Sequence, residues 1–329
     1  MRARSSAVAG AVALVVGLSA ASPVHAAPRP TGFVAVASAS GGRLTLTVPD
    51  FAVVEDVIDG GGPVAQAVLD TGTATSFASL PYPGDNAIAF PGLFNAATGQ
   101  DLPAGYPFYV RASHPTVPEQ QLSDPSGSYD LAARAAGGGA TGTARLGREP
   151  ARGLGGVPPT MAAGAAWESG RSQAGASATE DGDTVTVTAE TIDEALSLGG
   201  GALRVASVRS SAVTTWGAND AAPSTNTGLV VQGGSAGGYT FGFGPGGLVV
   251  ASQGAPLPVG EGLAALNQAL APAGISLRFL AAEAVAGGAT AGAFEITVRR
   301  SPPGQGVPGA VVRLRFGAAL AAIVLGQSA

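Results

Sequence analysis

Three stretches near the C-terminus alternate strictly between apolar and polar residues, and they indicate β-strands. They are residues 275–279 (ISLRF), 294–299 (FEITVR) and 312–316 (VRLRF). Successive side chains of a strand point to opposite faces of the sheet, so a period of two gives one buried face and one solvated face. We therefore predict three amphipathic strands of an antiparallel, curved sheet in this region.

One helix is predicted directly before these strands, over residues 261–271. Leu263, Leu266 and Leu270 recur at the three- and four-residue spacing that places side chains on one helical face, and Asn267 is expected to face away. A proline and a glycine follow within three residues and end the helix. We expect this helix to cover the apolar face of the sheet.

The remaining pattern is one of short strands separated by glycine and proline. It predicts a hairpin formed by residues 32–40 and 43–48 around two glycines, a short helix over 63–69, strands over 75–80, 106–112 and 128–135, a hairpin around 180–183, and a long strand over 203–216.

Together these elements predict a mainly β fold of the α+β class, an antiparallel curved sheet or sandwich with one or two short packed helices. The predicted organisation is a signal peptide at 1–26, a β-rich region punctuated by proline and glycine at 27–135, a Gly/Ala/Pro-rich linker or loose segment at 136–175, and a β-rich domain with the helix 261–271 at 176–329.

The N-terminus has the pattern of a secretory signal peptide. Arg2 and Arg4 precede a short apolar run over 7–21, and Val24 and Ala26 occupy the positions that a signal peptidase reads. The run is shorter than a membrane-spanning helix requires. We expect cleavage after Ala26, no transmembrane anchor afterwards, and a protein that is secreted to the extracellular space or the cell envelope.

Composition adds two expectations. The 329-residue chain has no cysteine and no lysine, and its apolar residues are mostly alanine and valine. Without disulfides the fold must depend on its core, and alanine gains little from burial, so we expect a wide, thin core. Arginine in place of lysine, with abundant alanine and glycine, is typical of a GC-rich bacterial coding sequence.

Several segments have the same character, namely 77–84 (FASLPYPG), 246–250 (GGLVV) and 256–258 (PLP). With them the chain resembles the uncharacterised Ala/Gly-rich, cysteine-free secreted proteins of actinomycetes. This resemblance implies no known activity, and it assigns a function to no residue.

Charge is sparse and uneven. The chain has a net charge of −5, yet its C-terminal strands carry an excess of arginine. The polar positions Arg278, Arg299, Arg313 and Arg315 form a candidate face for an anionic component of the cell envelope. The alternative is that they are only the solvated side of the strands. An acidic, exported chain is not expected to bind nucleic acid.

The apolar side of the same strands is a second candidate surface. Its residues are Leu263, Leu266, Leu270, Phe279, Phe294 and Phe316. If a space remains between helix and sheet, this side can hold a lipid or another apolar small molecule. If it does not, these residues are a closed core.

One motif resembles a catalytic signature. Residues 68–74 (VLDTGTA) resemble the Asp-Thr-Gly motif of aspartic proteases, in which two carboxylates share a proton. The chain has no second copy of the motif, although a homodimer could supply one. The alternative is that Asp70 and Gly72 form a turn into the next strand.

Other catalytic and metal chemistry has few candidate residues. After signal cleavage the only histidine is His114, and there is no cysteine or lysine, so most nucleophilic mechanisms and ordinary zinc sites lack a component. The acidic run 180–183 could offer oxygens to calcium, but a hairpin turn explains it more simply. We predict no catalytic residue, no metal site and no cofactor.

The leading hypothesis is a secreted, non-enzymatic protein of the bacterial cell surface or extracellular space. The first alternative is a carrier of a lipid or other apolar ligand in the envelope. The second is a hydrolase of the aspartic-protease type that uses Asp70.

Overall fold

The computed structural model describes residues 32–48, 56–80, 109–147, 151–152, 167–258, 260–300 and 309–326. It is 69% strand and 7% helical, with antiparallel sheets and one short α-helix. The predicted mainly β fold is therefore confirmed. The predicted signal peptide, 1–26, lies outside the described residues.

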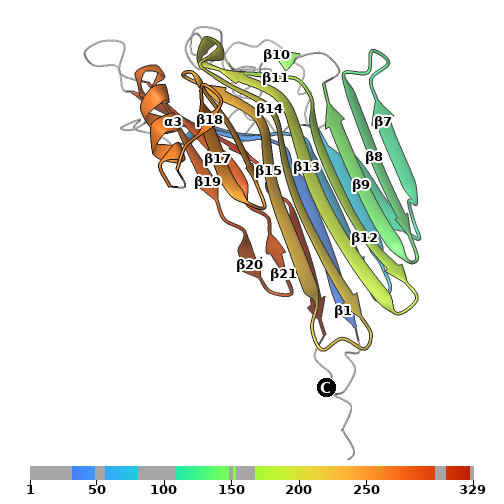
Figure 1. Ribbon diagram of the computed structural model, residues 1–329. Coiled ribbons are helices and arrows are strands. Elements are labelled where there is room, and N and C mark those ends of the chain that lie inside the picture. Colours follow the sequence, from blue (N-terminus) through green and yellow to red (C-terminus); the bar gives the residue numbers. More distant parts are fainter. Residues whose placement is uncertain are drawn as a thin grey trace, which may run out of the picture.

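One layer of the molecule is a broad sheet of twelve strands, in which almost every strand pairs with its neighbours in sequence. Figure 1 shows its long central strands running nearly the full length of the molecule. Its main path is β7 (Glu119–Ser123), β8 (Tyr129–Ala136), β9 (Gly139–Leu146), β12 (Ser172–Asp181), β13 (Thr184–Leu198), β14 (Leu203–Gly217), β15 (Ser224–Ala236), β16 (Tyr239–Gly244), β17 (Gly247–Ser252) and β18 (Ala255–Pro256), with β10 (Ala151–Arg152) and β11 (Trp167–Ser169) attached to β13.

The other layer consists of two sheets. The lower sheet has the order β20 (Glu283–Val285), β21 (Gly288–Thr290), β24 (Leu320–Leu325), β1 (Phe33–Ser40), β4 (Val64–Asp70), β5 (Ala74–Ser79) and β6 (Tyr109–His114). The upper sheet has the order β19 (Ile275–Leu280), β22 (Ala293–Arg300), β23 (Ala310–Phe316), β2 (Arg43–Thr47) and β3 (Asp56–Gly61). The chain joins neighbouring strands of the two sheets end to end. The joined pairs, in their order across both sheets, are β20 with β19, β21 with β22, β24 with β23, β1 with β2, and β4 with β3. The two sheets therefore form one bent layer.

Glycines make this bend possible. An added Cβ at Gly42, between β1 and β2, would lie 2.7 Å from the Phe316 ring, and one at Gly62 would lie 2.8 Å from the Gly41 backbone. Gly42 and Gly62 lie in segments where the chain crosses from one sheet to the other, and these segments are too close together for a side chain to fit between them. The chain crosses between the lower and upper sheets several times, and these crossings lie at the same level of the molecule.

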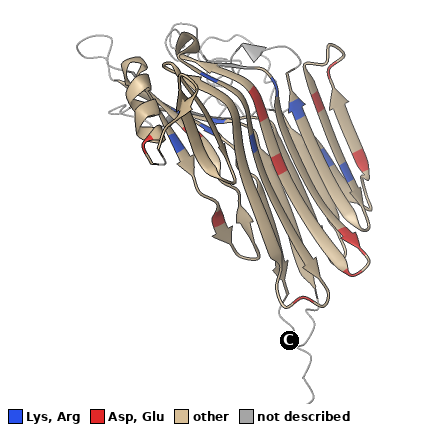
Figure 2. Ribbon diagram, in the orientation of Figure 1, with Lys and Arg blue, Asp and Glu red and all other residues tan. Residues whose placement is uncertain are grey.

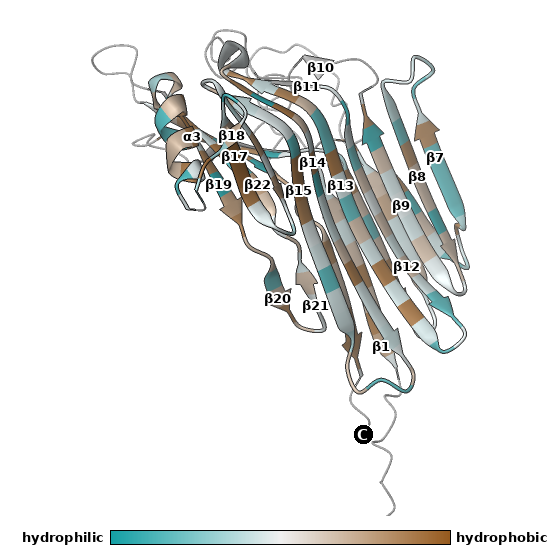
Figure 3. Cartoon of the chain, viewed as in Figure 1, coloured by the Kyte–Doolittle hydropathy of each residue, from teal (hydrophilic) through white to brown (hydrophobic). Residues whose placement is uncertain are grey.

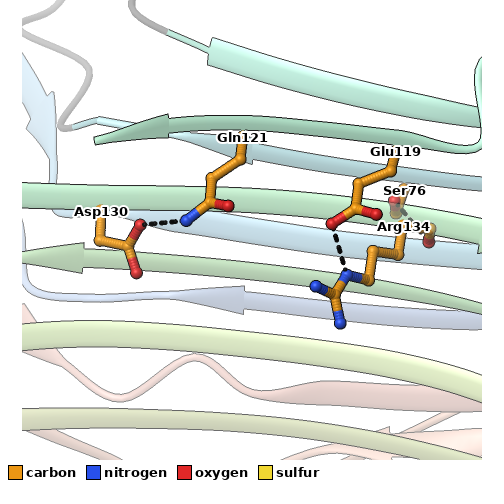
Figure 4. Close-up of polar contacts among 5 residues, drawn as sticks. All are labelled: Ser76, Glu119, Gln121, Asp130 and Arg134. Atoms are coloured by element: carbon orange, nitrogen blue, oxygen red, sulfur yellow. Dashed lines mark hydrogen bonds and ion pairs between the residues drawn. The ribbon is translucent and has the colours of Figure 1, made fainter.

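The core between the broad and lower sheets is thin, because alanine dominates it. At Gly142 of β9, an added Cβ would lie only 2.5 Å from the carbonyl oxygen of Phe77 in the opposite layer. Ser76 Oγ likewise donates a hydrogen bond across the layers to the Arg134 carbonyl, at 2.9 Å. Figure 4 shows this contact beside the Glu119–Arg134 pair on the outer side. The expected wide, thin core is confirmed here.

A second core cluster lies between the upper sheet and the broad sheet and has larger side chains. The helix α3 (Gly262–Leu270) closes one side of it with Leu266 and Leu270, next to the short 3-10 turn η2 (Ala271–Ala273); another 3-10 turn, η1 (Gly199–Gly201), links β13 to β14. Asn267 does not face away as predicted. Its side-chain amide accepts from the Leu277 N–H at 2.7 Å and donates to the Leu277 carbonyl at 3.2 Å, so it pairs with the edge strand β19.

Two local predictions are wrong. Residues 32–40 and 43–48 do form strands, but they do not pair as a hairpin. The first lies between β24 and β4, and the second between β23 and β3. Residues 64–70 form strand β4 rather than a helix. Burial alternates along the strand, and the small residues Ala65 and Ala67 face inward. Figure 3 shows the same alternation of hydropathy along the long strands of the broad sheet.

The predicted linker is also corrected in part. Residues 139–146 are strand β9, and residues 172–175 begin β12, both within the broad sheet. At Gly142 of β9 the opposite layer lies too close for any side chain. Strand β1 pairs with β24, so the N-terminal and C-terminal β-rich regions contribute strands to the same sheet.

Candidate anion-binding face

The outer face of the upper sheet brings the four predicted arginines together. In β23, Val312, Leu314 and Phe316 are buried, whereas Arg313 and Arg315 are exposed. Arg278 of β19 and Arg299 of β22 are also exposed, on the same side of the sheet. The predicted strand register is therefore correct for these residues.

The register arranges the side chains in rows. Arg278 lies opposite Glu295, Glu295 opposite Arg315, and Arg315 opposite Arg43 of β2. Adjacent strands are about 4.8 Å apart, so the row is compact. Arg278 Nε lies 3.5 Å from Glu295 Oε1, so the two side chains form a cross-strand ion pair. Such an exposed pair contributes at most about 1 kcal/mol.

Arg43 was missed by the sequence reading. It is exposed, and it lies directly across from Arg315. The only signal for it was the alternation in residues 43–47 (RLTLT), which did not show that this strand borders β23.

The described side chains of this face are strongly cationic. Arginines 43, 278, 299, 313 and 315 stand against the single glutamate Glu295, in a chain with 22 acidic and 17 basic residues. Figure 2 shows how sparse charge is on the rest of the ribbon. Guanidinium groups stay ionised and offer paired N–H donors that match phosphate and carboxylate oxygens. We call these five arginines the arginine face.

The predicted apolar surface lies inside the second core cluster. Leu266, Leu270, Phe294 and Phe316 are buried, whereas Leu263 and Phe279 are partly buried at its rim. The Phe279 ring lies 4.6 Å from the Phe243 ring and 5.2 Å from the Phe294 ring, centroid to centroid. These are the contacts of a packed core.

Asp70 lies in the turn between β4 and β5. Its Oδ1 accepts hydrogen bonds from the amides of Gly72 and Thr73, at 3.0 and 2.8 Å, and its Oδ2 accepts from the Thr73 hydroxyl at 3.0 Å. These bonds, the one from Gly72 first, lower the pKa of Asp70. An aspartic-protease pair needs one carboxyl that holds its proton. The geometry is that of a turn-stabilising carboxylate.

A buried acid was missed as well. Asp193 of β13 is fully buried, and its Oδ1 accepts hydrogen bonds from Ser172 Oγ at 2.6 Å and from the Gly42 amide at 3.3 Å. Among the described residues, its Oδ2 and the Thr191 hydroxyl have no hydrogen-bond partner. Burial raises the pKa of Asp193 to about 6, although the two hydrogen bonds oppose that rise. Asp193 thus connects the broad sheet to the bend of the other layer.

The described residues contain no group of three or more His, Cys, Asp or Glu side chains placed to hold a metal ion. None of their helices has the length and apolar character needed to cross a membrane.

Comparisons with known proteins add little. No protein-family model and no curated protein matches the chain. Among solved structures, one similar chain is described as OmpT (in-vitro folded), an outer membrane protein of Vibrio cholerae (trimer form). It is 10% identical, covers 87% of this chain and 99% of its own, and has a TM-score of 0.19. A likeness this slight carries no argument about fold or function.

Proposed function

We propose that this is a secreted, non-enzymatic protein of the bacterial cell surface, which binds an anionic component of the envelope through the arginine face. The observation that supports the proposal is that the side chains described on the outer face of the upper sheet include five arginines and one glutamate, in a chain whose net charge is −5.

Retention on host cells tests this proposal. The double variant Arg313→Gln, Arg315→Gln should fold normally, be washed from cells at lower salt than the wild type, and show a flatter dependence of retention on salt. The matched control removes the same charge from the outer face of the broad sheet, where Arg145 and Arg204 are exposed. Retention of the arginine-face variant equal to that of wild type and of Arg145→Gln, Arg204→Gln would contradict the proposal.

Export has its own test. If residues 1–26 are a signal peptide, N-terminal sequencing of the protein released by its host should begin at Ala27. Recovery of the uncut chain from the membrane fraction would refute secretion by this route.

A further inference from the structure

Part of the outer face of the lower sheet carries a cluster of valines. Val34 and Val324 lie directly opposite each other on β1 and β24, and they are 44% and 47% exposed. In the next row Val36 and Val68 are half-buried neighbours on β1 and β4, and Ala322 beside Val36 is buried. We call the four valines the valine patch; Asp70, which lies opposite Val34, borders it.

An aromatic pair lies on the same face, on the two strands β5 and β6 that follow β4 in the sheet. The rings of Phe77 on β5 and Tyr109 on β6 stack with centroids 5.7 Å apart, and Tyr109 is 51% exposed. Tyrosine combines an apolar ring with a polar hydroxyl, which suits the boundary between an apolar phase and water.

The opposite outer face of the molecule has a different character. Two rows of outward positions on the broad sheet are small and polar, namely Thr141, Ser177 and Thr188, and Thr179, Thr186 and Thr215, although Val213 continues the first row. The exposed Val249 of this sheet lies opposite Gly242 and not opposite another valine. Neighbouring exposed apolar side chains mark interaction sites, and the valine patch is such a group.

The valine patch and the arginine face lie on the same side. The chain passes from β1 directly into β2 and from β23 directly into β24, so the two sheets are consecutive parts of one layer. The inner sides of both sheets pack against the broad sheet. Their outer sides consequently form one surface, with the arginine face in its upper half and the valine patch in its lower half.

From this juxtaposition we propose that the partner of this surface is the interface of an anionic lipid bilayer, on which the protein lies without spanning it. The inference rests on the proposed function and narrows it. A soluble polyanion would use the arginines alone, and an uncharged apolar partner would use the valines alone. An anionic bilayer satisfies both, because its headgroups attract the guanidinium groups while its interface accepts exposed apolar side chains.

Binding to vesicles of defined composition tests the proposal. The full mature chain should bind vesicles of phosphatidylglycerol and phosphatidylcholine, and not vesicles of phosphatidylcholine alone. Arg313→Gln, Arg315→Gln should weaken binding at low salt about fivefold for each arginine. Val34→Ser, Val324→Ser should retain attraction at low salt but lose the part of the binding that persists at high salt. Val249→Ser is the matched control, since Val249 is 59% exposed on the outer side of the broad sheet.

A second readout does not depend on the strength of binding. Because the chain has no cysteine, a single introduced cysteine can carry an environment-sensitive dye. Dye on Val324→Cys should shift to the blue with anionic vesicles, whereas dye on Val249→Cys should not. Binding of the arginine variant is also measured with polyphosphate, a soluble polyanion. If the dye at position 324 does not shift, and the arginine variant loses binding to vesicles and to polyphosphate equally, the membrane inference is overturned. The anionic partner is then a soluble polymer. Loss of neither interaction in the arginine variant would overturn the proposed function itself.

Discussion

Replacement of Asp193 by asparagine should change how stability depends on pH. Burial raises the pKa of this carboxyl from its ordinary 3.8 to about 6, so the folded state holds the proton more tightly than the unfolded state does. The resulting stabilisation is fully present below the unfolded pKa. It is lost as the pH rises to the folded pKa and is absent above it.

The size of the effect follows from the same two pKa values. A difference of about two units corresponds to about 3 kcal/mol of unfolding free energy. Asparagine keeps the Oδ1 acceptor for Ser172 and Gly42 and removes the charge. The variant therefore resembles the protonated wild type at every pH.

Urea denaturation across the acid and neutral range measures this. The unfolding free energy of Asp193→Asn minus that of wild type should increase by about 2 kcal/mol between about pH 4 and pH 7, because part of the stabilisation is already lost at pH 4. Other titrating groups are common to both proteins and cancel in this difference. The same comparison can be made in a Ser172→Ala background, which lacks one hydrogen-bond donor to the ionised carboxyl. There the difference in unfolding free energy between the proteins with and without Asp193→Asn should increase more with pH. If this difference in unfolding free energy stays constant with pH, burial does not raise the pKa of Asp193.

Three further changes test the packing and the turn. Leu266→Ala should cost about 2–5 kcal/mol in chemical denaturation, because the side chain is fully buried, and a negligible cost would reveal an open cavity instead of a core. Gly142→Ala should cost about 1–3 kcal/mol, because its Cβ meets the Phe77 carbonyl, whereas Gly175→Ala, with no atom within 4 Å, should cost nothing. Asp70→Asn should preserve folding by circular dichroism, since Oδ1 still accepts the turn amides; an acid-optimal proteolytic activity that this change abolishes would contradict the turn assignment.

Strands with large apolar residues could be predicted from the sequence. In β19, β22 and β23 leucine, isoleucine, valine and phenylalanine alternate with charged residues, so the period of two is unmistakable. Strand β4 was missed because its inward residues include Ala65 and Ala67, whose small side chains give a weak hydropathy signal. The same cause made β9 resemble a linker, although its small residues let the two layers approach.

Long-range pairing could not be predicted. Nothing local to Gly41 and Gly42 distinguishes a hairpin turn from a crossover between two sheets; the difference lies in the distant partners β24 and β23. For this reason the sequence suggested four arginines of the face and not Arg43, which joins them only through the pairing of β2 with β23. Asp193 was overlooked for a related reason, since its burial depends on residues 151 positions away.

Hydrogen–deuterium exchange on the full chain, with and without isolated bacterial envelope, shows which surface the envelope covers. We expect added protection in peptides of the upper sheet, above all 310–316 and 293–299, and none in peptides of β12 and β13 on the opposite side. Protection confined to the broad sheet, or absent from the arginine face while the protein is bound, would contradict this expectation.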